Sequence, residues 1–242
     1  MSGYDPTVAS LTIRATLGRK RALLFAAPPL ILVAVSALLR LASSGDPSWP
    51  AQILGGFGFS AVLPLTALII GTTVLGAEAD DGTIVHLLAT PVPRRTIVCT
   101  KFVVAAVTTM VFAAVPEFLA GLIATGGPTR LAVGLFLGAL AASVVYNAVF
   151  VCLSVVTTRA LAAGLFYVLL WEGALANLVG GARILSVGHY GLALANGIAH
   201  NRALHPGVGP VTATVMAVTV TLAGLIIAAR GLSSFSLRGD AA

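Results

Sequence analysis

The sequence predicts an all-α membrane protein with six transmembrane helices in a single domain, residues 1–242. Hydrophobic residues make up 58% of the chain, charged residues make up 9%, and the mean hydropathy is +1.01. A soluble domain would have about a quarter of its residues charged, so this chain has too little polar surface for a globule in water. Its apolar residues form six runs of about 18 to 26 residues, a length that crosses a bilayer as a helix. We find no internal repeat and no low-complexity linker.

Residues 1–21 are polar enough to stay outside the hydrocarbon, and their apolar positions follow a helical spacing among basic residues. This pattern predicts an amphipathic helix at the cytoplasmic surface. The first span, Leu23–Ala42, is too long for the hydrophobic region of a signal peptide, so we expect it to remain in the membrane. Pro28 and Pro29 near its start should kink the helix or delay its regular part.

Five further spans follow from the positions of the other apolar runs. They are Gln52–Ala77, Phe102–Ala124, Leu131–Val156, Leu161–Leu178 and Pro210–Ala229. Residues 179–209, before the last span, are less apolar and predict two short amphipathic helices, roughly Ala182–His189 and Tyr190–His200. Neither is long enough to cross the bilayer. We therefore expect this segment to stay at one side of the membrane.

The basic residues set the predicted orientation, because cytoplasmic loops carry an excess of Lys and Arg. With both termini in the cytoplasm, 10 of the 14 basic residues fall inside: Arg14, Arg19, Lys20, Arg21, Arg94, Arg95, Lys101, Arg159, Arg230 and Arg238. The four outside are Arg40, Arg130, Arg183 and Arg202. We predict a multi-pass protein of the cell (inner) membrane with both termini cytoplasmic. Cys99 and Cys152 then lie near cytoplasmic span ends, where we expect free thiols.

A polar interruption, Gly76–Lys101, separates the second and third predicted spans. It opens with three acids, Glu78, Asp80 and Asp81, and closes with basic residues. The Asp81 carboxylate can accept hydrogen bonds from the first-turn amides of a short helix whose apolar residues follow a helical spacing. Pro91 disfavours helix at the residue before it, so this helix should be about two turns long.

This stretch resembles the loop between the second and third spans of type-2 ABC exporter permeases, of the bacterial multidrug and natural-product export class. The pattern E-x-D-D-G-T-I-x-x-L-L-A-T-P-V-x-R-R-x-I-V-x-x-K carries the resemblance, together with the layout of the spans. In that family the loop contains a coupling helix that sits in a groove of the ATPase subunit. The resemblance implies a coupling loop at residues 78–95, with the ATPase contacted by Glu78, Asp80, Asp81, Gly82, Thr83, Ile84, His86 and Leu87. The same residues would also suit a capped interfacial loop that keeps two spans apart.

The resemblance also implies an assembly and an activity. Two permease subunits, identical or homologous, would pair in the lipid, each docked on an ATPase subunit that holds ATP and magnesium. The N-terminal helix would either touch the ATPase or serve as a plain membrane anchor, and residues 179–209 would form short re-entrant helices on the outer side. The complex would export an amphipathic drug, lipid or natural product by alternating access. Its pathway would run between the second and fifth spans of the two protomers.

The chain lacks the motifs of an enzyme and of a nucleic-acid-binding protein. No G-x-x-x-x-G-K-[ST], H-E-x-x-H or G-x-S-x-G pattern is present, so we expect no ATP hydrolysis, no other catalysis, no metal site and no cofactor bound by this chain. The net charge of +6 comes from basic residues near the span ends rather than from a nucleic-acid-binding patch. His189, His200 and His205 have no regular ligand spacing, and we interpret them as surface residues.

Two carboxylates, Glu117 and Glu172, lie within predicted spans. A charge there costs several kcal/mol unless it is protonated, paired or hydrated. In one interpretation both line a wet substrate pathway, and Trp171 beside Glu172 would suit an amphipathic cation. In the other they are structural, either protonated and hydrogen-bonded between helices or paired with Arg130 or Arg183. An ion-coupled secondary transporter with both glutamates as proton sites is the alternative function, although repeat symmetry would be expected of it.

Overall fold

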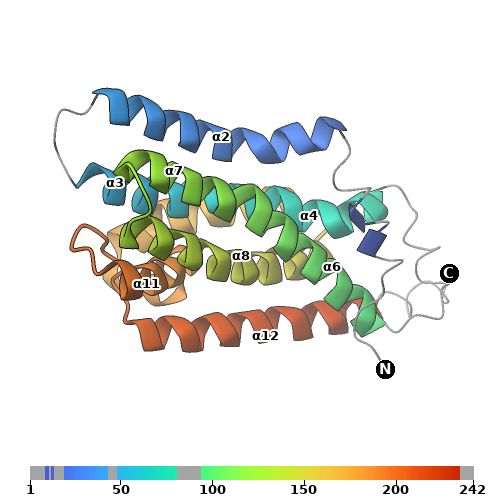
Figure 1. The fold of residues 1–242 in the computed structure, drawn as a ribbon. Coiled ribbons are helices and arrows are strands. Elements are labelled where there is room, and N and C mark those ends of the chain that lie inside the picture. The colour runs from blue at the N-terminus through green and yellow to red at the C-terminus, as the bar shows by residue number, and fades with distance from the viewer. Residues whose placement is uncertain (1–8, 11, 14–18, 43–47, 81–93, 235–242) are drawn as a thin grey trace.

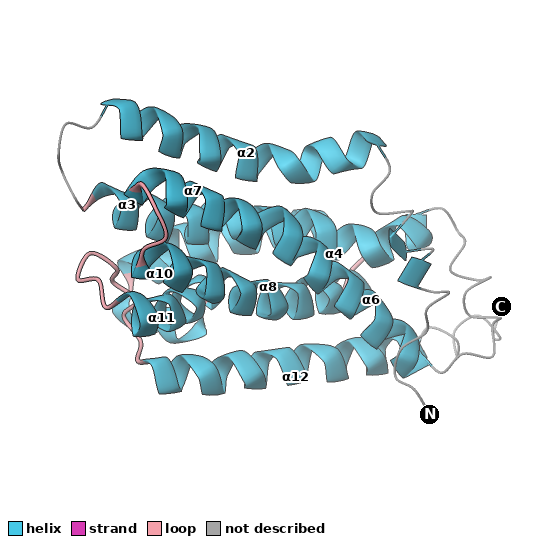
Figure 2. Cartoon of the chain, in the orientation of Figure 1, coloured by secondary structure: helices cyan, strands magenta, loops and turns pink. Residues whose placement is uncertain are grey.

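The computed structural model of the chain describes residues 9–10, 12–13, 19–42, 48–80 and 94–234, and these contain helices and short connections without any strand (Figure 1, Figure 2). Three helical runs form the first half of the bundle. They are α2 (Arg19–Ala42), then α3 (Trp49–Gln52), η1 (Ile53–Val62) and α4 (Leu63–Asp80) in one run, and then α6 (Arg94–Thr109), η2 (Met110–Ala114) and α7 (Val115–Thr125) in another.

The second half contains two further long helices and a group of shorter ones between them. They are α8 (Arg130–Val156), the run of α9 (Ala160–Phe166), η3 (Tyr167–Leu175) and α10 (Ala176–Leu178), then η4 (Gly180–Leu185), α11 (Val187–Ala199) and α12 (Pro210–Ser234). Successive long runs pass in opposite directions, so the bundle has two ends (Figure 1). We name the end where α4 stops and α6 begins the Arg95 end, and the opposite one the α11 end.

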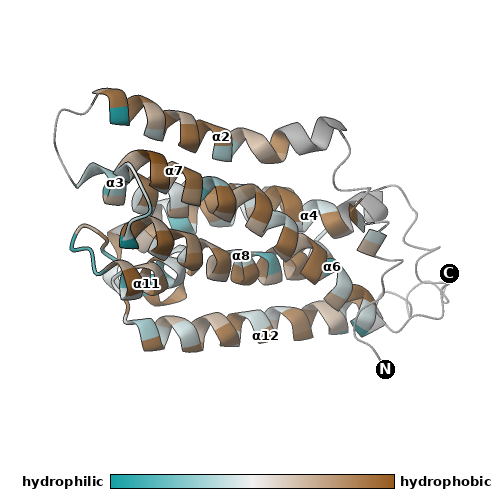
Figure 3. Cartoon of the chain, in the orientation of Figure 1, coloured by the Kyte–Doolittle hydropathy of each residue, from teal (hydrophilic) through white to brown (hydrophobic). Residues whose placement is uncertain are grey.

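Five of the described helices are long and apolar enough to cross a membrane: Leu24–Ala42, Trp49–Val74, Arg95–Thr125, Arg130–Val156 and Pro210–Leu232. The predicted fifth span, Leu161–Leu178, falls on a shorter apolar helix, Ala160–Leu175. Apolar side chains are exposed along α2 and α12, as at Leu38 and Val211. Both helices carry hydrophobic residues along their described length (Figure 3). The all-helical, multi-pass character is thus confirmed, while the count of six spans stays a prediction.

The two prolines of the first span do not delay its helix, and the alternative prediction of a kink stays a prediction. α2 continues as helix through Pro28 and Pro29, so its regular part is not delayed. Each proline removes one N–H donor, which leaves the carbonyls of Leu24 and Phe25 without their usual partners. A helix of 24 residues retains enough backbone hydrogen bonds on both sides of this point to continue.

The segment 179–209 divides at a different residue from the predicted one. It contains the 3-10 helix η4 and the helix α11, with the break at Ser186 rather than after His189. The Ser186 hydroxyl accepts a hydrogen bond from the backbone amide of His189 at 3.3 Å. Serine is a favoured N-cap because it satisfies such a first-turn amide, so α11 begins directly after it.

Two π-helical segments end two residues before a proline. η1 ends at Val62, with Pro64 following, and η2 ends at Ala114, with Pro116 following. Proline cannot donate to the carbonyl four residues earlier and its ring crowds that carbonyl, and a wider turn relieves both problems. Membrane helices tolerate such breaks where neighbouring helices enclose them. Both π-helical segments lie within longer helical runs.

α8 is the central helix of the bundle, in contact with α4, α7, α11 and α12. Its crossing with α11 is lined by small residues at four-residue spacing: Gly134, Gly138 and Ala142 on α8, and Gly191, Ala195 and Ala199 on α11. A Cβ atom on Gly138 would lie 2.4 Å from the carbonyl oxygen of Gly191. Stripes of small residues let membrane helices approach closely. This packing holds α11 inside the bundle although it is only 13 residues long.

Gly138→Ala should destabilise the protein, although alanine is the better helix former by about 1 kcal/mol. Its methyl group would meet a backbone oxygen of α11, so the two helices would have to separate. Gly197→Ala is the matched control, because a Cβ there has nothing within 4 Å. Thermal unfolding in detergent should give a lower midpoint for Gly138→Ala and an unchanged or higher one for Gly197→Ala. Equal midpoints would contradict the close crossing.

Candidate functional site

The predicted coupling residues lie at the limit of the described structure. Glu78 and Asp80 belong to the last turn of α4. The others, Asp81, Gly82, Thr83, Ile84, His86 and Leu87, lie outside the described residues, as does the predicted short helix after Asp81. The structure does describe the frame of this loop, since α4 leads into it and α6 leads out of it at the Arg95 end (Figure 1). The coupling role of these residues stays a prediction.

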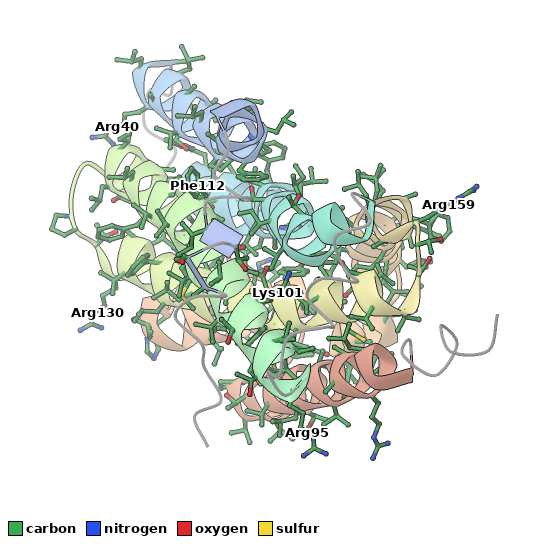
Figure 4. All side chains as sticks on the ribbon, turned by 90° about the vertical axis from the view of Figure 1, so that its right-hand side faces the viewer. Arg40, Arg95, Lys101, Phe112, Arg130 and Arg159 are labelled. Atoms are coloured by element: carbon green, nitrogen blue, oxygen red, sulfur yellow. The ribbon has the colours of Figure 1, made fainter. Side chains whose placement is uncertain are left out.

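Lys101 joins the two helices of this frame. Its side chain is fully buried, and its Nζ donates to the carbonyl oxygen of Val74 on α4 at 2.8 Å. Viewed from the Arg95 end, Lys101 lies inside the bundle, whereas Arg95 and Arg159 project outward (Figure 4). A buried ammonium group is costly without hydrogen-bond partners. The bond therefore holds α4 and α6 together beside the predicted coupling loop.

Glu172, on η3, is buried and accepts four hydrogen bonds. The Tyr167 hydroxyl and the amide of Val187 donate to Oε1 at 2.9 and 2.8 Å. The Ser186 hydroxyl and the amide of Gly188 donate to Oε2 at 2.5 and 3.3 Å. Both amides belong to the first turn of α11, whose donors have no partner within the helix. This geometry supports the structural interpretation of Glu172, and a role in a substrate pathway stays a prediction.

Trp171 also makes a structural contact. Its indole Nε1 donates to the carbonyl oxygen of Leu185 at 3.3 Å, at the end of η4. Within η4, the Nε of Arg183 donates to the carbonyl oxygen of Ala176 at 3.3 Å. The two bonds tie η4 back to the run that precedes it. They fix the direction from which the chain enters α11.

Glu117 lies in the first turn of α7 and is only 1% exposed. Its carboxylate rests against Gly58 of η1, where a Cβ atom would lie 2.6 Å from Oε2. Its Oε1 has no hydrogen-bond partner among the described residues, and the side chain of Arg130 is exposed. A buried carboxyl group requires a partner or a proton. Glu117 therefore remains a candidate for the substrate pathway.

Both glutamates border η1, within the second predicted span. Gly58 contacts Glu117, and the carbonyl oxygen of the next residue, Phe59, lies 3.1 Å from the position of a Cβ on Gly188. The Gly188 amide is one of the donors to Glu172. A displacement of η1 would therefore disturb the surroundings of both carboxylates.

A cavity of about 250 Å³ lies at the α11 end, between α3, η1, α11 and the chain that follows α11. Its walls are Ala51, Gln52, Gly55, Gly56, Ser60, His189, Leu192, Ala203, Leu204 and His205. His189 is 5% exposed, so its predicted surface position is wrong, whereas His200 and His205 are exposed. The packing of α11 buries His189, and its Nδ1 lies 2.9 Å from the Ser186 hydroxyl. We name this space the His189 cavity.

Sequence reasoning missed the partners of Glu172. Tyr167 was an ordinary residue of an apolar run, and only Ser186 carried a signal, as an N-cap type of residue ahead of an apolar segment. Within the part of the chain that the structure describes, no three His, Cys, Asp or Glu side chains come together in a way that could hold a metal ion.

A family model described as "ABC-2 family transporter protein" matches residues 8–185. The matched range covers well over half of the 242 residues. It includes the predicted coupling residues, Glu117, Trp171 and Glu172, and it ends immediately before Ser186. A search of curated proteins gives no match.

Gly58→Ala should lower the unfolding temperature, because the added methyl group would lie 2.6 Å from the Glu117 carboxylate. Gly56→Ala in the same π-helix is the control, since a Cβ there has nothing within 4 Å. The penalty of Gly58→Ala should shrink by about 1 kcal/mol or more in a Glu117→Ala background, which removes the obstructing group. A penalty of the same size in both backgrounds would show that the two residues do not interact.

Proposed function

Because the chain belongs to the ABC-2 transporter family, we propose that it is the permease subunit of an ATP-binding cassette exporter that moves an amphipathic small molecule or lipid. The observation that carries the proposal is the family match over residues 8–185, in a chain with five described helices long and apolar enough to span a membrane. A separate ATPase subunit would hold ATP and magnesium and hydrolyse the nucleotide. This chain would supply half of the membrane pathway.

The proposed partners are the ABC ATPase and a second permease, identical or homologous. The ATPase would dock on the coupling residues Glu78, Asp80, Asp81, Gly82, Thr83, Ile84, His86 and Leu87, between α4 and α6. The hydrogen bond from Lys101 to Val74 supports this arrangement, because two helices that are bonded beside the loop would move together when the loop moves. ATP binding would then bias the spans between two arrangements through differential contacts.

The ion-coupled alternative has weaker support. The family match favours an ATP-driven transporter. The carboxylate of Glu172 is occupied by the first turn of α11 and by two hydroxyl groups, which suits a structural anchor better than a proton carrier. Glu117 alone has a buried carboxylate oxygen that lacks a hydrogen-bond partner among the described residues.

Cysteine labelling tests the predicted orientation. In a variant whose Cys99 and Cys152 are replaced by serine, cysteines introduced at Ser44 and His200 should react with a membrane-impermeant reagent added outside. Cysteines introduced at Asp81 and Arg238 should react only after the membrane is opened. Outside labelling at Asp81 would contradict a cytoplasmic coupling loop.

Gly82→Trp tests the coupling loop. Gly82 has no side chain and allows a close backbone approach, so an indole there should block docking without preventing membrane insertion. We expect normal membrane levels, loss of the co-purified ATPase and loss of substrate-stimulated ATP hydrolysis. Gly127→Trp is the matched control, because Gly127 lies in the turn before α8 at the other end of the bundle and a Cβ there has nothing within 4 Å. If Gly82→Trp still binds the ATPase and is stimulated like wild type, docking at this loop is wrong.

A further inference from the structure

We propose that the His189 cavity is a binding site for an uncharged group that donates a hydrogen bond, such as the hydroxyl of an amphipathic alcohol, with Nε2 of His189 as the acceptor. The proposal deepens the proposed function by naming a class of transported compound, and this assignment to transport rests on the permease function. Binding at the cavity needs neither an ATPase nor a second permease. It can therefore fail or succeed independently of the exporter assignment.

A chain of hydrogen bonds from Glu172 through Ser186 to His189 fixes the tautomer of the imidazole. The Ser186 hydroxyl has one hydrogen, which it donates to Oε2 of Glu172 at 2.5 Å. Its oxygen accepts from the backbone amide of His189 at 3.3 Å and faces Nδ1 of His189 at 2.9 Å. With the serine hydrogen already used, Nδ1 must carry the ring hydrogen. A neutral imidazole has one such hydrogen, so Nε2 is left as a hydrogen-bond acceptor.

Glu172 can dictate this direction because the groups hydrogen-bonded to it are placed as donors. In the four hydrogen bonds described above the carboxylate is the acceptor, and two of the donors are backbone amides that cannot accept. With both carboxylate oxygens accepting, the Ser186 hydroxyl donates its hydrogen to Oε2. The acceptor at the Glu172 end of the chain therefore decides which nitrogen of His189 is left without a hydrogen at the other end.

His189 itself is neutral at neutral pH. Burial lowers the pKa of His189 to about 4, and the nearby Arg183 guanidinium adds to the effect. None of the described residues that line the cavity is acidic, so a cationic ligand would find no counter-charge there. An anion would meet the lone pair of Nε2. An uncharged donor avoids both conflicts.

The rest of the cavity suits the apolar part of such a ligand. Gly56 leaves open space in the wall, because a Cβ there has nothing within 4 Å. Leu192 and Leu204 supply apolar surface. Leu204 packs closely against Gly55, since a Cβ atom on Gly55 would lie only 2.6 Å from the Leu204 side chain. A small number of placed polar groups in a largely apolar cavity is the usual form of a small-molecule site.

Two isomers provide the test: 1-octanol, which donates and accepts, and 1-methoxyheptane, which only accepts. Protein labelled with [15N]histidine is examined by 15N NMR in dodecylphosphocholine, a detergent without hydroxyl groups, and His189→Asn identifies the His189 signals among the four histidines. In the wild type we expect Nδ1 to be protonated and Nε2 to be unprotonated. The 15N signal of Nε2 should shift when octanol is added and should not shift with the ether. Octanol should bind roughly three- to tenfold more tightly, the contribution of one neutral hydrogen bond.

Glu172→Gln should reverse the donor–acceptor direction of the hydrogen bonds that run from residue 172 through Ser186 to His189. The Val187 amide donates to Oε1 at 2.8 Å and the Gly188 amide donates to Oε2 at 3.3 Å, so the shorter bond keeps the carbonyl oxygen of the glutamine at the Oε1 position. The NH2 group then donates to Ser186 and the serine hydrogen turns to Nδ1. The ring hydrogen then lies on Nε2, and the ether should now shift that signal. If this variant does not fold, Ser186→Ala serves instead, because Nδ1 loses its partner and the Nε2-protonated form should appear.

Gly56→Leu separates the cavity from the hydrogen-bond chain. The added side chain should fill the open space, which would abolish the response to octanol and leave the tautomer of His189 unchanged. A wild-type His189 protonated on Nε2 would overturn the proposal, as would equal responses to the two isomers. A full octanol response in Gly56→Leu would place the alcohol elsewhere and would overturn it as well.

Discussion

A helix that begins inside a packed bundle has first-turn amides that need hydrogen-bond acceptors. At the α11 end of this protein, Glu172 is the acceptor for two of them, and the arrangement of that end depends on this interaction. The carboxylate on η3 binds the amides of Val187 and Gly188, and the Ser186 hydroxyl links it to His189. α11 is too short to span a bilayer, so this anchor and the close packing on α8 hold it in place. The wall of the His189 cavity exists because α11 stays there.

Glycine and proline allow polar groups to enter this largely apolar bundle. Pro64 and Pro116 each follow a widened π-helical turn, and Gly58 in one of these turns leaves room for the carboxylate of Glu117. Gly138 likewise leaves room for a polar group, the backbone of α11, which comes into contact with α8 there. Lipid offers no hydrogen bonds to such groups, so they gather where helices enclose them.

Long-range contacts mark the limit of what the sequence could predict. Leu131–Val156 was predicted as a span and α8 occupies Arg130–Val156, because an apolar run of that length has few options other than a helix in a membrane. The burial of His189 was missed, since it depends on contacts with Ser186 and on the packing of α11. The donors to Glu172 were missed for the same reason, because Ser186, Val187 and Gly188 lie 14 to 16 residues further along the chain.

In the proposed exporter, one continuous helical run, Trp49 to Asp80, extends from the coupling loop to the His189 cavity. Near the Arg95 end it is bonded to α6 through Val74 and Lys101. Toward the α11 end it contributes the glycines of the cavity wall, the contact with Glu117 and the Phe59 carbonyl beside α11. The π-helical part η1 carries all three features, and π-helical turns are frequent at functional sites. A movement of α4 driven by the ATPase would therefore reach the cavity through the backbone of one helix and change its wall directly.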